Sequence, residues 1–162
     1  MSSLDAIKNK IIKWVNSDYS AQFKVVKEKK YDPKNFPFLL NIEPTNPSGV
    51  KMPMFVYKPT DYKDKISVYS VLSFDKKQIK YFDALKPKVK KKVVLELSEG
   101  LIWMNLVVSF SPESTQNIRH IGFQEIIYLD GLSKDRIMNA ITRTLTAYGY
   151  VVTVLEKYNI LA

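Results

Sequence analysis

Apolar residues recur at every second position in six stretches of the chain, and this alternation constrains the fold more than any other feature. In one stretch it runs without a miss through Phe36, Phe38, Leu40 and Ile42. A period of two places every apolar side chain on one face of a strand, so each stretch predicts a strand with one buried face. The six predicted strands cover residues 23–30, 36–43, 52–56, 66–74, 101–110 and 118–129.

Three other stretches carry apolar residues at every third or fourth position, which is the period of an amphipathic helix. The longest covers residues 75–99, begins with the capping-box spacing of Asp75 and Gln78, and is expected to end at Gly100. Pro87 lies inside this stretch. Because the apolar stripe keeps its phase across Pro87, we expect a kinked helix rather than two helices. The other two predicted helices cover residues 3–16 and 133–158.

The order of elements is therefore helix, four strands, long helix, two strands, helix. Strands that follow one another in blocks predict hairpin connections and a mainly antiparallel sheet covered by helices. Prolines and polar residues predict a turn at 31–35 and a loop at 44–51. No repeat or long linker divides the 162 residues, so we expect a single α+β domain over residues 1–162.

Composition excludes several kinds of chemistry. The chain has no cysteine, so it forms no disulfide, thiolate metal site or cysteine nucleophile, and a reducing, cytoplasmic location is expected. The five glycines are too scattered for a phosphate-binding loop. No apolar run approaches the roughly 18 residues of a membrane span. We expect no cofactor, no metal, no catalytic site and no membrane span.

An enzymatic site would have to use carboxylates and the only histidine, His120. Glu125 shares its strand face with apolar neighbours, and a buried carboxylate needs either a partner or a raised pKa. A site around Glu125 and His120 is therefore the enzymatic alternative, against a structural role for both groups. As metal ligands, the carboxylate pairs Asp61 with Asp64 and Glu96 with Glu99 would be candidates. The first pair lies in a Lys-rich turn and the second near a helix end, so solvated surface is favoured for both.

The net charge is +9, from 25 basic and 16 acidic residues. Such a charge attracts phosphates, anionic lipid or acidic proteins, and it is also typical of a Lys-rich thermophile, including an archaeal one. Lysines gather on the side of the central helix away from its apolar stripe. This side is either a phosphate-binding surface or a solvated face. The candidate polyanion surface consists of Lys77, Lys80, Lys88, Lys91 and Lys92.

The predicted strand 101–110 has a second apolar face, opposite Met104 and Leu106. If helices cover only one face of the sheet, this second face needs another cover. A second copy of the chain, a bound peptide or burial under a helix would supply it. The candidate partner or dimer surface consists of Leu101, Trp103, Val107, Val89 and Val93.

The order of elements resembles the secretion-chaperone-like α+β fold, which includes type III secretion chaperones and uncharacterised archaeal domains. The resemblance covers most of the chain and consists of topology, without a residue motif. It implies homodimers that hold an extended partner segment, and no enzymatic activity. Those chaperones are usually acidic and have three strands before the long helix, whereas this chain is basic and has four. The resemblance therefore transfers the fold and dimerisation but no functional residue.

Three functions follow from these observations. The first is a non-enzymatic protein-binding or chaperone-like domain that acts as a homodimer through the central helix and the strand 101–110. The alternative is a nucleic-acid-binding protein that uses the Lys-rich helix face. A second alternative is an enzyme with a carboxylate-based site.

Overall fold

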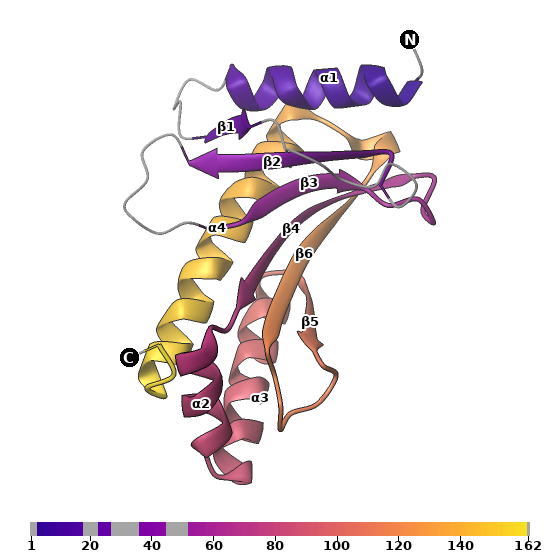
Figure 1. The fold of residues 1–162 in the computed structure, drawn as a ribbon. Coiled ribbons are helices and arrows are strands. Elements are labelled where there is room, and N and C mark those ends of the chain that lie inside the picture. The colour runs from indigo at the N-terminus through magenta and orange to yellow at the C-terminus, as the bar shows by residue number, and fades with distance from the viewer. Residues whose placement is uncertain (1–2, 18–22, 27–35, 45–51, 162) are drawn as a thin grey trace.

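The structure is a computed structural model that describes residues 3–17, 23–26, 36–44 and 52–161. It contains one six-stranded sheet in the order β1-β2-β3-β4-β6-β5, and every neighbouring pair is antiparallel. The α+β prediction is therefore confirmed (Figure 1). The main elements are α1 (Ser3–Asn16), β1 (Phe23–Val26), β2 (Phe38–Pro44), β3 (Met54–Lys58), β4 (Lys65–Ser73), α2 (Lys76–Ala84), α3 (Pro87–Trp103), β5 (Val107–Ser111), β6 (His120–Tyr128) and α4 (Lys134–Lys157).

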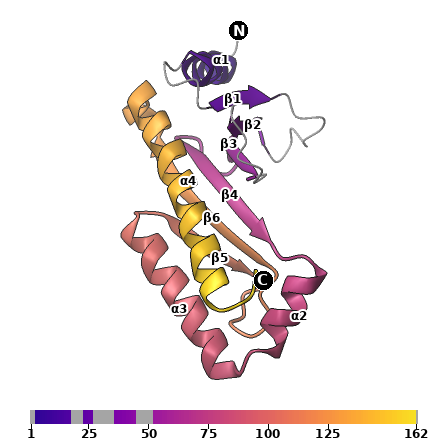
Figure 2. The ribbon, with the colours of Figure 1, turned by 90° about the vertical axis from the view of Figure 1, so that its left-hand side faces the viewer.

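The helices α1, α3 and α4 pack on one face of the sheet. The 24-residue helix α4 contacts β4, β6, α1 and α3, and Figure 2 shows it lying along the two long central strands. Ser133 caps α4, because its hydroxyl accepts a hydrogen bond from the Arg136 amide at 3.2 Å. Since α4 runs the length of β4 and β6, it joins the two ends of the fold.

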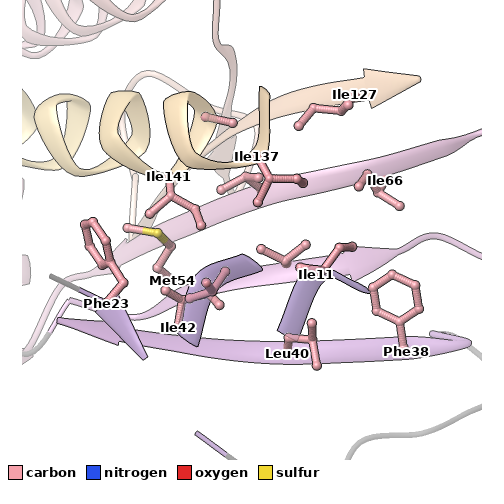
Figure 3. Close-up of a cluster of buried hydrophobic side chains, with 14 of the residues drawn as sticks. Ile11, Phe23, Phe38, Leu40, Ile42, Met54, Ile66, Ile127, Ile137 and Ile141 are labelled. Atoms are coloured by element: carbon pink, nitrogen blue, oxygen red, sulfur yellow. The ribbon is translucent and has the colours of Figure 1, made fainter. Parts of the chain in front are cut away.

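The apolar side chains under the helices form two clusters. In the first, Ile137 and Ile141 of α4 meet Ile42 and Met54 of the sheet, and Ile11 of α1 joins them (Figure 3). The second lies between α2, α3, the far end of α4 and the strands β4, β5 and β6. Its most buried members include Phe82, Leu97, Leu101, Phe123 and Val151.

Pro87 divides the predicted central helix in two, so the expected kink is wrong. The helix α2 begins at a capping box, as predicted from Asp75 and Gln78, but it ends at Ala84. Lys86 is extended, with φ −61° and ψ 145°, and Pro87 is the first residue of α3. This outcome follows from proline chemistry, because a residue before proline avoids the helical region and proline itself fits the first helical turn.

Gly100 does not end the helix, contrary to the prediction. The helix α3 continues to Trp103, and β5 begins only at Val107. A Cβ atom on Gly100 would lie 2.2 Å from Cζ of Tyr150, so the glycine is needed for close approach of α4. Leu101 is consequently a helical residue, on the same stripe as Leu97.

The remaining strands follow the alternation. The strand β3 begins at Met54, directly after Pro53, and pairs with both β2 and β4. The register of β6 on β4 is continuous from His120 to Tyr128. Three predicted segments lie outside the described residues: the end of the first strand at 27–30, the turn at 31–35 and most of the loop at 44–51.

Candidate protein-binding surface

The helix α3 carries apolar residues on two opposite faces. On the inner face, Val93, Leu97 and Leu101 are 1%, 0% and 0% exposed. On the outer face, Leu95 is 54% exposed and Ile102 is 62% exposed, and Trp103 at the helix end is 86% exposed. Large apolar side chains that a fold leaves in water together mark an interaction site. The outer face of α3 is therefore a candidate protein-binding surface.

The structure separates the predicted partner residues. Val93 and Leu101 are buried, which corrects their placement on an open surface. Their burial follows from the continuation of α3, because a helical period aligns them with Leu97. Val89 is half-buried. Trp103 and Val107 are exposed, at the end of α3 and in β5 respectively.

Charged residues share the outer face of α3 with these apolar side chains. Lys88, Lys91 and Lys92 are exposed in its first half, and Glu99 is exposed in its second half. A helix turns by 100° per residue, so positions four and seven apart lie on one face. The outer face therefore has a basic beginning, an apolar centre at Leu95, and an acidic and apolar end.

Three hydrogen bonds to Glu96 hold α3 against α4 and the residue that follows it. Lys157 Nζ lies 2.7 Å from Oε1 of Glu96, and the Tyr158 hydroxyl donates to Oε2 at 2.8 Å. The Tyr150 hydroxyl donates to the Glu96 carbonyl at 2.7 Å. The hydrogen bonds from Lys157 and Tyr158 lower the pKa of Glu96. Because both carboxylate oxygens have protein partners, Glu96 fits a structural role better than the metal ligation considered from the sequence.

The strand β5 forms an edge of the sheet, because among the described residues it pairs with β6 alone. A groove of about 360 Å³ runs beside it. Val94 of α3 and Val108 and Phe110 of β5 supply its apolar walls. The remaining lining residues are Ser109, Glu113, Ser114 and Thr115. A free strand edge next to an apolar groove is the geometry that binds an extended peptide.

The sheet face away from the helices is partly covered by its own aromatic side chains. The rings of Tyr57 and Tyr69 meet edge to face with centroids 6.2 Å apart, and Phe36 meets Tyr57 at 5.4 Å. The Tyr57 hydroxyl lies 2.9 Å from Oε1 of Gln124, to which it donates. Burial raises the pKa of both tyrosines. The need for an external cover is therefore greatest near β5, where Val107 is 51% exposed.

The predicted polyanion residues lie on two helices instead of one. Lys77 and Lys80 belong to α2, and Lys88, Lys91 and Lys92 belong to α3. All five residues are exposed. Lys90, which precedes Lys91 and Lys92, is instead buried, with its Nζ atom over the ring of Phe82. The five lysines are therefore exposed, but the break before Pro87 divides them between two helices, and polyanion binding stays a prediction.

The two groups of the enzymatic alternative lie apart. His120 and Glu125 are five residues from one another on β6, which corresponds to about 17 Å, and they point to opposite faces. His120 is exposed, with Nδ1 2.9 Å from the Ser73 hydroxyl. Glu125 points towards α4, where Oε2 forms an ion pair with Nη1 of Arg143 at 2.8 Å. The angles of this contact do not meet those of a hydrogen bond. Glu125 thus has the charged partner that a mostly buried carboxylate needs, and the two groups share no site.

Sequence reasoning missed Leu95, Ile102 and the groove residue Val94. Leu95 and Ile102 are seven residues apart, on the side of the helix opposite the apolar stripe. That spacing was a usable signal, because two large apolar residues on a polar helix face indicate a second contact. Val94 gave no such signal, since its role depends on where β5 lies.

The fold defines an α+β protein with helices on one face of an antiparallel sheet. A family model described as an uncharacterized conserved protein, DUF2299, matches residues 7–155, and the chain belongs to this family. The chain is similar in fold to the crystal structure of an uncharacterized protein from Methanothermobacter thermautotrophicus, with a TM-score of 0.72 and 16% identity. The match covers 93% of this chain and 98% of that one. No curated protein matches. Because neither match names a secretion chaperone, that resemblance stays a prediction.

Among the helices in the described ranges, none is both long and apolar enough to span a bilayer.

Proposed function

We propose that this protein is a non-enzymatic, cytoplasmic protein-binding domain that acts as a homodimer and holds an extended segment of a partner protein. The observation that carries the proposal is the exposure of large apolar side chains on α3 and β5, around a free sheet edge. A folded chain gains nothing from such exposure by itself, since about 25 cal/mol is lost for each Å² of apolar surface left in water. A protein partner that covers these side chains recovers this free energy.

The groove beside β5 favours an extended segment as the bound form. A strand added to the edge would receive main-chain hydrogen bonds from β5, and its alternate side chains would enter the groove. Val94, Val108 and Phe110 make the groove walls apolar, so apolar side chains fit there. The volume of about 360 Å³ lies in the range of roughly 300–1,000 Å³ that is usual for ligand pockets.

A peptide-display selection tests this proposal. Random peptides on phage are selected on the wild-type chain, after depletion on a Val94→Lys variant whose charge enters the apolar groove wall. We expect enriched peptides with apolar residues at alternate positions, and at least tenfold weaker binding to Val94→Lys. Leu145→Lys is the matched control, because Leu145 is exposed on α4 outside the groove. Equal enrichment on wild type and Val94→Lys would contradict the proposal.

Nucleic-acid binding is the second candidate, and the five exposed lysines on α2 and α3 are the observation that favours it. Binding to phosphates releases counterions, so affinity would fall steeply with salt. A fluorescent single-stranded oligonucleotide and a duplex, titrated over a salt series, test this candidate. The candidate is lost if neither probe shows a salt-dependent change in anisotropy.

A further inference from the structure

The outer face of α3 is self-complementary when it is read from Leu95 in both directions. Four residues before Leu95 is Lys91, and four residues after it is Glu99. Seven residues before Leu95 is Lys88, and seven residues after it is Ile102. All five side chains are exposed on the same side of the helix. Each basic position before Leu95 therefore has an acidic or apolar position at the same distance after it.

Two antiparallel helices related by a two-fold axis bring such mirror-related positions together. With the axis at Leu95, each residue faces the residue equally far from Leu95 on the other copy. Lys91, with Lys92 beside it, would then face Glu99 of the second copy. A parallel arrangement would instead place lysines against lysines, and like charges in contact repel.

We propose that the outer face of α3 is the homodimer interface, in which α3 packs antiparallel to α3 of a second copy about a two-fold axis at Leu95. This inference rests on the proposed protein-binding function and names the surface and the geometry of its homodimer. A two-fold interface is closed, because the same patch is used by both copies. The contact therefore produces a dimer and not a filament.

The apolar side chains of this face are placed to gain from the contact. Leu95 meets its own copy on the axis, where burial is deepest. Trp103 lies at the end of the face, opposite the beginning of the other helix, within reach of the Lys88 stem and ammonium group. An ammonium group over an indole ring is attracted to it, most strongly when both are desolvated. Trp103 is the most exposed large apolar residue among the described residues, and the contact would cover it.

The charges choose the register of the two helices. Each dimer contains the contact between Lys91 or Lys92 and Glu99 twice, so one substitution changes two contacts. Charge pairs at the edge of an interface add modest affinity but discriminate strongly against wrong pairings. Reversing either sign should therefore weaken the dimer, and reversing both should restore it.

Charge exchange between two variants tests the geometry. Sedimentation velocity over a concentration series gives the dimer dissociation constant of wild type, of the double variant K91E with K92E, of E99K, and of their equimolar mixture. We expect wild type to dimerise, and each variant alone to bind itself at least tenfold more weakly. The mixture should form a heterodimer with affinity within about threefold of wild type, because it pairs opposite charges at both contacts.

The control is a double variant, K76E with K80E, on α2. It changes the net charge by the same amount as K91E with K92E, but it lies outside the outer face of α3. Its dissociation constant should stay within about threefold of wild type. Circular dichroism and thermal unfolding confirm that every variant folds, which is expected because the substituted side chains are exposed.

Each contrary outcome has a separate meaning. If wild type dimerises but the variants dimerise equally tightly, the α3 geometry is overturned, while the protein-binding homodimer remains with another surface. If wild type is monomeric throughout, the interface inference and the homodimer of the proposed function are both overturned, and the peptide selection decides independently whether the protein binds an extended segment. Recovery in the mixture is a result that unfolding or a general charge effect would not produce.

Tryptophan fluorescence supplies a second readout. The chain has two tryptophans, so a Trp14→Phe background leaves Trp103 as the only indole. In the dimer the emission of Trp103 should lie at shorter wavelength than in the monomer, and dilution should shift it to longer wavelength. Emission that is independent of concentration, over a range in which sedimentation shows dissociation, would contradict the position of Trp103 in the interface.

Discussion

The two faces of α3 contain similar apolar residues but have different consequences for the fold. Leu97 on the inner face is fully buried by α4 and the sheet, whereas Leu95, two residues earlier, is 54% exposed. Both are leucines in the middle of one helix, so their chemistry and local conformation are the same. The comparison teaches that the inner face supplies folding free energy, while the outer face is available for binding.

The largest difference should come from the two leucines themselves. Leu97→Ala leaves a cavity in the second apolar cluster and should lower the free energy of unfolding by about 2–5 kcal/mol. Leu95→Ala should change it by less than about 0.5 kcal/mol, since its side chain is mostly in water. Urea denaturation, at a concentration where the chain is monomeric, measures both values. Equal losses would show that the outer face also contributes to the fold.

One glycine in α3 and one in α4 sharpen the comparison further. Gly100→Ala would force its Cβ into the ring of Tyr150, so we expect a loss of about 1–3 kcal/mol. Gly149→Ala is the control, because a Cβ there meets nothing within 4 Å. Alanine has the higher helix propensity, and Gly149→Ala should therefore gain about 0.5–1 kcal/mol. If both variants shifted the unfolding temperature in the same direction, the close contact between Gly100 and Tyr150 would be contradicted.

Two consecutive lysines of α3 provide the next comparison. Lys90 is 7% exposed, and its Nζ donates to the Gln116 carbonyl at 3.1 Å and lies 5.5 Å from the centroid of Phe82. Lys90→Ala removes this charged donor and should lower the free energy of unfolding by about 1.5–3 kcal/mol. Lys91→Ala, on the outer face, should leave monomer stability unchanged. A smaller loss for Lys90→Ala than for Lys91→Ala in urea denaturation would overturn the assignment of the two faces.

The smallest expected effect concerns pH. Hydrogen bonds from Lys157 and Tyr158 lower the pKa of Glu96 below its ordinary value of 4.5. Its stabilising contribution is therefore complete above about pH 4.5 and is lost as the pH falls through the lowered folded pKa. Glu96→Gln should lower the unfolding temperature near neutral pH and bring the two proteins closer together in acid. Parallel curves of unfolding temperature against pH for the two proteins would exclude this role of Glu96.

Much of the fold could be predicted because hydrophobic period is a local property. The alternation through Phe38, Leu40 and Ile42 predicted β2, and the spacing of Asp75 and Gln78 predicted the start of α2. Pro87 was interpreted wrongly, since the apolar stripe continues across it although the helix does not. The stripe keeps its phase because α2 and α3 both pack on the same cluster, not because they form one helix.

The candidate site was predicted only in part. Trp103 and Val107 are exposed as expected, but Leu101 and Val93 are buried. The error followed from Gly100, which looks like a helix end in sequence and serves instead as the contact point for Tyr150. Such a role depends on a residue fifty positions away, and a local pattern does not report it.

The sequence by itself determined the class of fold, because the periods of two and of 3.6 residues decide which segments bury one face as strands and which as helices. Only the tertiary structure decided which apolar residues remain in water. Leu95 and Leu97 are indistinguishable in type, and burial depends on the place of α4 and the sheet around α3. That placement arises from contacts between segments far apart in the chain, whose free energies no single segment contains.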